Sequence, residues 1–156
     1  MWEKNALPDQ SKKTTTDRES LIPQSQLDSL NIADAKNFDA MQLLVNGKLM
    51  FVFWCVLGDD FHVTKGLIQE FPLSPDFASV GQHADVSTLA KKLDKAMHEA
   101  LQYKKNAGMN IGNFNLAICR HITDQGDCLI LEALGLPEIF DDIELYCSRV
   151  VRTSFE

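Results

Sequence analysis

The order of apolar and polar positions divides the chain into a polar N-terminal segment and a longer remainder with apolar periodicity. Residues 1–26 are rich in Lys, Thr, Ser, Gln and Asp, with few apolar groups, chiefly Trp2 and the Leu21–Ile22 pair. A segment of this composition cannot bury enough surface to offset the entropy lost on ordering. We therefore predict a mobile polar arm over residues 1–26 and a single globular domain over residues 27–156.

The densest apolar block is the unbroken run Leu49–Leu57. Its length is compatible with a buried helix or a buried strand, and periodicity does not separate the two; we favour a helix. A helix is also predicted just before it, because Asp34 or Asn37 can cap its start and Asn46–Gly47 is a turn signal. The apolar residues of that first helix fall at helical spacing: Phe38, Met41, Leu44 and Val45.

The clearest helical pattern covers Asp85–Lys105, with Asp85 or Ser87 as its cap and Gly108 as its stop signal. Its core face is predicted from helical spacing to contain Val86, Leu89, Leu93, Ala96, Met97, Ala100 and Tyr103. A narrow arc on the opposite face contains Lys91, Lys95, His98, Gln102 and Lys105. A solvated helix face is the simpler interpretation, although this arc is also the best basic patch in the chain.

Shorter elements complete the pattern. Thr64 can cap a short helix through Gln69, which Pro72 prevents from continuing. After the long helix we predict a loop or sheet edge over Asn110–Asn115 and a short strand over Leu116–Ile122. Two further helices are predicted, one from Thr123 to Leu134 that Gly135 ends, and one beginning at Pro137. The expected fold class is therefore α+β and mostly helical, with a small β element packed against a helical bundle.

Charge limits how this chain can meet nucleic acid. The chain has 156 residues and a formal net charge of −7, whereas a protein that binds nucleic acid over its whole surface is normally basic. From Ala107 onward there are 8 acidic and 3 basic residues, a composition better suited to a protein partner than to phosphate. Any contact with DNA must therefore use a local patch or a more basic partner.

Candidate catalytic constellations in the sequence are weak. It contains no Gly-rich phosphate loop, no GxSxG and no HExxH. Four cysteines without a CxxC pair indicate a reducing compartment, and no apolar run is long enough to span a bilayer, so we expect a cytoplasmic chain without a membrane segment. Zinc ligands are conceivable at Cys119, His121, Cys128 and Cys147, but buried thiols are the simpler interpretation.

A family resemblance covers most of the chain from Leu27 to Glu156. The stretch FDAMQLLVNGKLMFVFWCVLGDDFHVTKGLIQEFPL resembles the C-terminal target-recognition region of adenine-specific DNA methyltransferases of restriction-modification systems. That region has a leucine-rich helix, an Asn-Ser/Gly-Lys-Leu turn and a closing "vtk..l..lPl" pattern. The later stretch KNAGMNIGNFNLAICRHITDQGDCLILEALGL, ahead of DDIELY, is similar to the extreme C-terminus of some members.

The resemblance implies recognition without methyl transfer. This chain has neither the Gly-rich S-adenosylmethionine strand–turn nor the Asn/Asp-Pro-Pro-aromatic motif of those enzymes, so the cofactor is expected on a partner subunit and none on this chain. The expected partner is a larger methyltransferase or nuclease subunit, with DNA contacted through the complex in phage defence. Positions expected to face DNA are Asn46, Lys48, His62, Thr64, Lys65, Asn113 and Arg120, to which the basic arc adds Lys91 and Lys95.

Two other classes of function remain open at this level. An acidic protein-interaction module could occupy the basic surface of a DNA-binding partner, and the net charge of −7 favours it. A small metal-dependent enzyme could use the Cys/His set. Each of the nine positions named above also has a simpler interpretation as a turn residue or a solvated side chain.

Overall fold

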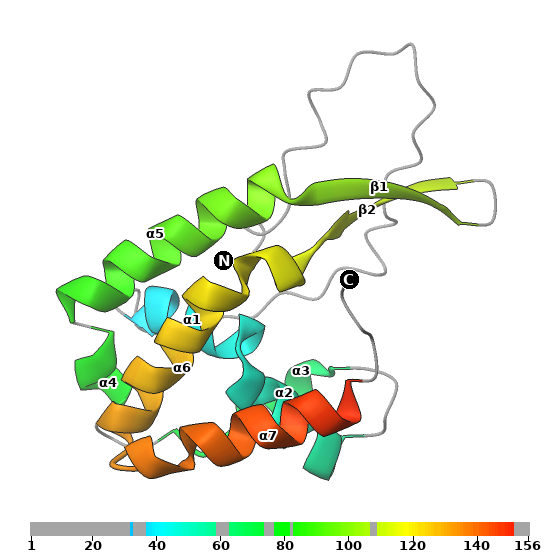
Figure 1. Ribbon diagram of the computed structural model, residues 1–156. Coiled ribbons are helices and arrows are strands. Elements are labelled where there is room, and N and C mark those ends of the chain that lie inside the picture. The colour runs from blue at the N-terminus through cyan, green and yellow to red at the C-terminus, as the bar shows by residue number, and fades with distance from the viewer. Residues whose placement is uncertain are drawn as a thin grey trace.

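Over the residues that the structure describes, the fold is built mainly from helices, with one two-stranded sheet (Figure 1). It is seen in a computed structural model that describes residue 32 and residues 37–58, 63–73, 77–81, 83–106 and 109–151; the side chains of residues 78–79, 104–106 and 109–113 are not described. The predicted arm, Asp34, His62 and Gly108 lie outside these ranges. The fold class predicted from the sequence, mostly helical with a small β element, is confirmed.

The elements follow one another along the chain with short connections. The described helices are α1 (Phe38–Asn46), α2 (Lys48–Leu57), α3 (Lys65–Gln69), α4 (Phe77–Val80), α5 (Ala84–Glu99), α6 (Arg120–Ala133) and α7 (Phe140–Val150). The strands are β1 (Leu101–Asn106) and β2 (Met109–Phe114), and two short 3₁₀ helices, η5 (Leu116–Cys119) and η6 (Pro137–Ile139), precede α6 and α7.

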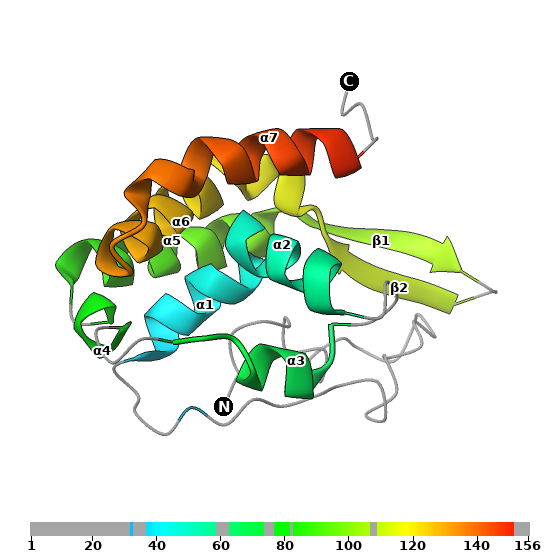
Figure 2. The same cartoon turned by 90° about the horizontal axis from the view of Figure 1, so that it is seen from below.

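The core lies where α1, α5 and α6 pack against one another. Leu43 and Leu44 of α1, Leu93 of α5 and Ile130 of α6 are all fully buried there. The apolar block at 49–57 is a helix, α2, as the sequence favoured, and it packs between α7 on one side and α3 on the other (Figure 2). Of the residues of α2 only Lys48 and Met50 are buried, and Val56 and Leu57 are 67% and 59% exposed, so the block is half-buried and not buried throughout as its composition suggested.

The axis of the chain bends by 63° at Gly47, between α1 and α2. Gly47 is extended, with φ −89° and ψ 170°, and its N–H donates to the carbonyl of Leu44 at 3.1 Å. The predicted turn at Asn46–Gly47 is therefore confirmed. Among the described residues no single helix is long and apolar enough to cross a membrane; α1 and α2 reach that length and composition only when taken together.

The long helix ends six residues earlier than predicted. Its last residue is Glu99, and Gln102 and Lys105 belong to β1 instead of the predicted basic arc. Tyr103, predicted on the core face, is 40% exposed in β1. The polar run after Ala100 has no strong helical preference of its own, so pairing with β2 decides its conformation; tertiary context here overrides the helical spacing.

The segment predicted as a strand at 116–122 is helical. Asn115 accepts a hydrogen bond from the N–H of Ala117 at 3.3 Å and starts η5, which runs directly into α6. Thr123 is consequently not a cap but lies in the first turn of α6, where its hydroxyl donates to the carbonyl of Arg120 at 3.0 Å. The predicted loop or edge at 110–115 corresponds to β2.

The predicted helix caps have mixed outcomes. Thr64 caps α3, because its Oγ1 accepts from the N–H of Leu67 at 3.2 Å. Asn37 precedes α1 without a side-chain cap, and α5 begins at Ala84 after His83, also without one. Asp85 therefore lies in the first turn of α5, where a carboxylate interacts favourably with the helix dipole.

The two strands form an antiparallel hairpin that stands out from the helical body (Figures 1 and 2). The register pairs Leu101 with Phe114 at the base and Asn106 with Met109 at the far end. Phe114 makes an edge contact with His98 of α5, with ring centroids 6.2 Å apart. The base of the hairpin is thereby held on α5, whereas most of its length extends beyond the helices.

The turn that ends α6 provides a test of the fold. Gly135 has φ +73°, a left-handed conformation, and a Cβ added there would meet no atom within 4 Å. We expect Gly135→Ala to lower the free energy of unfolding by about 1 kcal/mol, purely through backbone strain. Gly135→Asn should cost less, because Asn tolerates this conformation better. Chemical denaturation measures both, and equal losses would contradict a backbone origin.

Candidate functional site

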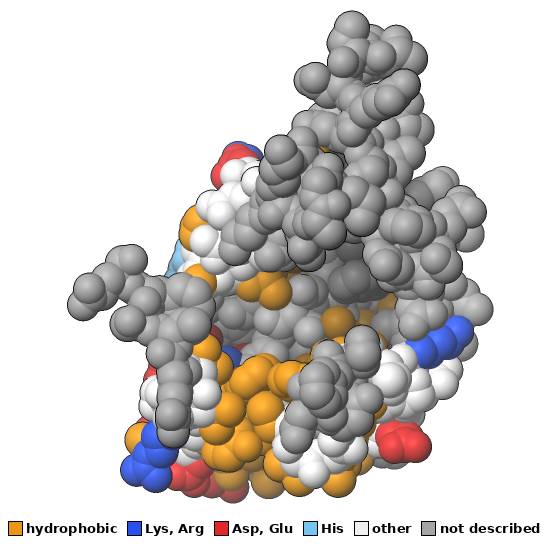
Figure 3. All heavy atoms as spheres, turned by 90° about the vertical axis from the view of Figure 1, so that its right-hand side faces the viewer, with side chains coloured by type: hydrophobic (Ala, Val, Ile, Leu, Met, Phe, Trp, Pro, Cys, Tyr) orange, Lys and Arg blue, Asp and Glu red, His pale blue; other side chains and the backbone are white. Residues whose placement is uncertain are grey.

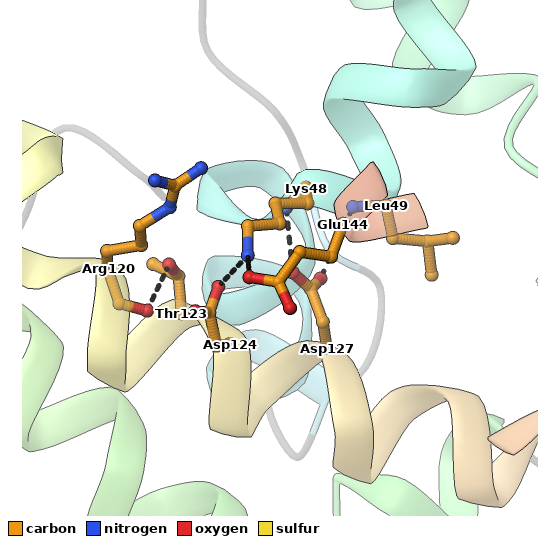
Figure 4. Close-up of polar contacts among 7 residues, drawn as sticks. All are labelled: Lys48, Leu49, Arg120, Thr123, Asp124, Asp127 and Glu144. Atoms are coloured by element: carbon orange, nitrogen blue, oxygen red, sulfur yellow. Dashed lines mark hydrogen bonds and ion pairs between the residues drawn. The ribbon is translucent and has the colours of Figure 1, made fainter. Parts of the chain in front are cut away.

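A buried lysine joins three helices beside the bend between α1 and α2. Lys48, the first residue of α2, is only 8% exposed. Its Nζ lies 2.8 Å from Oδ1 of Asp124 on α6 and 3.1 Å from Oε1 of Glu144 on α7 (Figure 4). Burial by itself would lower the pKa of Lys48, but hydrogen bonds and charge from the two carboxylates outweigh it, and the pKa is raised. Lys48 is therefore charged at neutral pH.

A second carboxylate of α6 caps the N-terminus of α2. Oδ2 of Asp127 accepts from the backbone N–H of Lys48 at 2.7 Å, and Oδ1 lies 3.4 Å from the donor N–H of Leu49. Asp127 has no exposed surface. The first N–H groups of a helix have no partner within the helix, and Gly47 has no side chain to supply one. Asp127 therefore performs from a distant helix the task that a local cap residue usually performs.

Burial raises the pKa of Asp127 to about 6. The two backbone hydrogen bonds and the positive charge of Lys48 act in the opposite direction, and the neighbouring Asp124 adds to the rise. At neutral pH Asp127 is therefore ionised inside the fold. A buried carboxylate accepting two N–H groups is satisfied, but its desolvation still opposes the charged form.

A mostly apolar cavity of about 410 Å³ lies next to this lysine. That volume is within the range of small-ligand pockets, roughly 300–1,000 Å³. Its described lining is Val45, Asn46, Gly47, Lys48, Met50, Phe51, Trp54, Val63, Leu116, Ala117, Arg120, Thr123, Cys147 and Val151. The cavity therefore lies between the start of α2, the end of α7 and η5 at the foot of the hairpin, and we call it the α2–η5 pocket.

The face of the molecule toward which the hairpin and the end of α7 point is rich in apolar side chains (Figure 3). Val63 and Leu116, which line the α2–η5 pocket, are 50% and 37% exposed. Val150, next to the lining residue Val151, is 44% exposed. Exposed apolar residues gathered around a concave site are typical of a binding surface.

The structure brings three of the residues predicted to face DNA into this one pocket. Asn46, Lys48 and Arg120 all line it. Asn46 is half-buried and its Nδ2 donates to the carbonyl of Gln42 at 2.8 Å. Lys48 uses its charge inside the fold, so we leave it out of the DNA-contacting surface proposed below. Arg120, the first residue of α6, is exposed.

The other predicted positions are spread over the molecule. Thr64 is engaged as the cap of α3, and Lys65 is the first residue of that helix. Lys91 and Lys95 are exposed on α5, with Nζ of Lys95 3.8 Å from Oε1 of Glu99. Asn113 belongs to β2, with its side chain not described, and His62 lies outside the described residues.

The three carboxylates around Lys48, those of Asp124, Asp127 and Glu144, were not predicted from the sequence. Asp127 falls at helical spacing with the buried residues Thr123, Ile130 and Leu131 of α6. A carboxylate on the core face of an amphipathic helix is a signal of a buried polar contact, because an unpartnered charge there is costly. The partner of Asp127 could not be inferred from the sequence, because it is the backbone N–H of Lys48 at the N-terminus of α2, 79 residues away.

The described cysteines and histidines do not come together at one site. Among the described residues, no group of three or more His, Cys, Asp or Glu side chains is placed to hold a metal ion. Burial raises the pKa of Cys119, Cys128 and Cys147 above the usual thiol value, so these groups are protonated at neutral pH. A protonated thiol is a poor ligand and a poor nucleophile.

Fold and site together define a helical α+β domain with an apolar pocket and a projecting hairpin. Comparison of the chain with protein-family models, curated proteins and solved structures gave no match. The function proposed below therefore depends on the residues of this chain and on the resemblance of its motifs.

Titration of Asp127 leads to a testable pH dependence. Because its pKa is about 6 in the folded protein against an ordinary value of 3.8, the folded state binds the extra proton between these values. The tighter binding of this proton stabilises the folded protein by its full amount below pH 3.8, and this stabilisation is lost as the pH rises through 6. A rise of this size corresponds to about 3 kcal/mol.

Asp127→Asn removes this titration. Its unfolding free energy, measured relative to the unsubstituted protein, should therefore increase by about 2.5 kcal/mol between pH 4 and pH 7. Urea denaturation across this pH range gives the difference directly. A constant difference between the two proteins would show that Asp127 titrates normally in the folded state.

The contact between Gly47 and Asp127 can be tested with a matched pair of substitutions. A Cβ at Gly47 would overlap Oδ1 of Asp127, whereas a Cβ at Gly66 in α3 would meet nothing closer than 3.9 Å. We expect Gly47→Ala to lower the free energy of unfolding by about 1–3 kcal/mol through overpacking. Gly66→Ala should raise it by about 0.5–1 kcal/mol through helix propensity. A neutral Gly47→Ala variant would contradict the tight approach.

Proposed function

We propose that this chain is a non-catalytic DNA-recognition or assembly part of a DNA-methylating restriction-modification system that acts in phage defence. A larger methyltransferase or nuclease subunit supplies S-adenosylmethionine and the chemistry. The proposal is supported by the target-recognition motifs in the sequence and, above all, by the hairpin that stands out from the helical body (Figure 1). A two-stranded β ribbon is one of the elements that the major groove of DNA admits.

The composition of the hairpin is suited to DNA. Residues 101–114 contain Lys104 and Lys105 and no acidic residue, so this segment has a charge of +2. The rest of the chain then has a net charge of −9, from −7 minus +2. Asn106, Asn110 and Asn113 add side chains that can bond to base edges. An acidic body with a basic projection favours an approach to DNA with the hairpin first.

The lysines of α5 form the alternative DNA surface. Lys91 and Lys95 are exposed, but Glu99 is close to Lys95, and Asp94 is half-buried on the same helix. The positive potential of this face is therefore reduced by its own carboxylates. The hairpin has no such neighbours within its own sequence, and we favour it for this reason.

A charge-matched comparison of the two surfaces tests the proposal. The double variant Lys104→Ala/Lys105→Ala and the double variant Lys91→Ala/Lys95→Ala each remove two positive charges. Binding to labelled duplex DNA is measured by fluorescence anisotropy over a salt series, with the chain alone and with its co-purified partner subunit. The hairpin variant should weaken binding and reduce the slope of log affinity against log salt by about 2.

The α5 variant should retain nearly the same slope as the unsubstituted chain. The reverse result would place the DNA contact on α5. DNA binding that is undetectable at low salt, both alone and with the partner, would refute the recognition role.

One feature supports the second candidate, an acidic module that binds a DNA-binding protein. Leu145 on α7 is 49% exposed, and Asp141 and Asp142 on the same helix are also exposed. An exposed leucine among carboxylates suits a basic partner helix with an apolar residue. Affinity for a basic protein together with none for DNA would favour this candidate.

A further inference from the structure

We propose that the α2–η5 pocket is the docking site for a short segment of the partner protein in which a bulky apolar side chain is next to an Asp or Glu. The apolar side chain enters the cavity of about 410 Å³, and the carboxylate pairs with Arg120 at its edge. This inference deepens the proposed function, because the segment belongs to the larger subunit with which the chain assembles.

The lining of the pocket favours an apolar occupant. Met50, Phe51 and Trp54 of α2 form one wall, and Leu116 and Ala117 of η5 contribute another. Apolar anchors that fill such cavities provide much of the affinity in protein interfaces. The exposed residues Val63 and Leu116 at the pocket extend the apolar surface beyond the cavity itself.

Three polar side chains of the described lining, those of Lys48, Asn46 and Thr123, are already engaged within the chain. Nζ of Lys48 is bound by two carboxylates, Nδ2 of Asn46 donates to the carbonyl of Gln42, and Oγ1 of Thr123 donates to the carbonyl of Arg120. A nucleobase has donors and acceptors along its edge that need partners when buried. Because this lining offers so few, a nucleobase is a poorer occupant than an aliphatic or aromatic side chain.

Arg120 determines the charge of the preferred segment. It is exposed, it lines the pocket, and the described lining contains no carboxylate. The other lining cation, Lys48, is held by Asp124 and Glu144, which leaves Arg120 as the cation of the described lining that is available to a carboxylate of the segment. A guanidinium binds a carboxylate through two parallel hydrogen bonds, which fixes the register of a docked peptide.

The test uses the full chain and a displayed library of random linear peptides. Selection should enrich peptides that contain a bulky apolar residue adjacent to Asp or Glu, and these are then synthesised. The chain has two tryptophans, so Trp2→Phe leaves Trp54 in the pocket wall as the single fluorescent reporter. Its emission should change as each enriched peptide is titrated.

Two matched variants separate docking from general surface effects. Leu116 and Ile118 both lie in η5 and are 37% and 56% exposed, but only Leu116 lines the pocket. Leu116→Asp should weaken peptide binding by about tenfold or more, whereas Ile118→Asp should leave it unchanged. Arg120→Glu should abolish the preference for acidic flanking residues. Circular dichroism of each variant serves as the control that it is folded.

Three outcomes would overturn the docking inference: no enriched motif, equal binding by Leu116→Asp, or a Trp54 response to single-stranded oligothymidine that Leu116→Asp removes. The last would assign the pocket to nucleic acid. The Lys104→Ala/Lys105→Ala variant separates this result from the proposed function. Peptide binding without any DNA binding would support the docking site and refute the DNA-recognition role. DNA binding without peptide binding would refute the docking site and support the DNA-recognition role.

Discussion

The carboxylate of Asp127 connects the N-terminal and C-terminal parts of the helical body. It accepts hydrogen bonds at the start of α2, next to the bend that lets α1 and α2 pack in different directions. Lys48 adds its ion pairs to α6 and α7 at the same point. Replacing such a buried network by apolar groups can be neutral for stability, so its clearest effect here is to fix where α2 begins relative to α6.

The sequence predicted the helices well wherever apolar spacing and local signals agreed. Thr64 caps α3 and Gly135 ends α6, because each of these effects depends only on neighbouring residues. The turn signal at Gly47 also marks the end of α1, although the cap of α2 that follows it comes from the distant Asp127. The predicted end of α5 was wrong, because the residues after Ala100 pair as a strand with the later segment Met109–Phe114. Lys48 was predicted on the surface, since its three carboxylate partners lie 76–96 positions away, at Asp124, Asp127 and Glu144. Local pattern cannot reveal partners at that separation.

Charge is unevenly distributed in this protein, and both proposed binding surfaces, the hairpin and the edge of the α2–η5 pocket at Arg120, carry positive charge. The basic hairpin and Arg120 are joined through η5, which links β2 to α6. The carboxylates Glu138, Asp141 and Asp142 lie in η6 and the first turn of α7. An anionic ligand is therefore attracted to the end with the hairpin and repelled from the start of α7. Both DNA and an acidic peptide segment would meet the chain there.

The cap of α2 also has a consequence for the order of events during synthesis. The residues of α2 leave the ribosome long before Asp127, which is 79 positions further along than Lys48. Until α6 is present, the first N–H groups of α2 must be satisfied by water, and its apolar faces have neither α6 nor α7 to cover them. The most apolar block of the chain can therefore complete its packing only after α6 and α7 have been made, and until then it is exposed to chaperones and to aggregation.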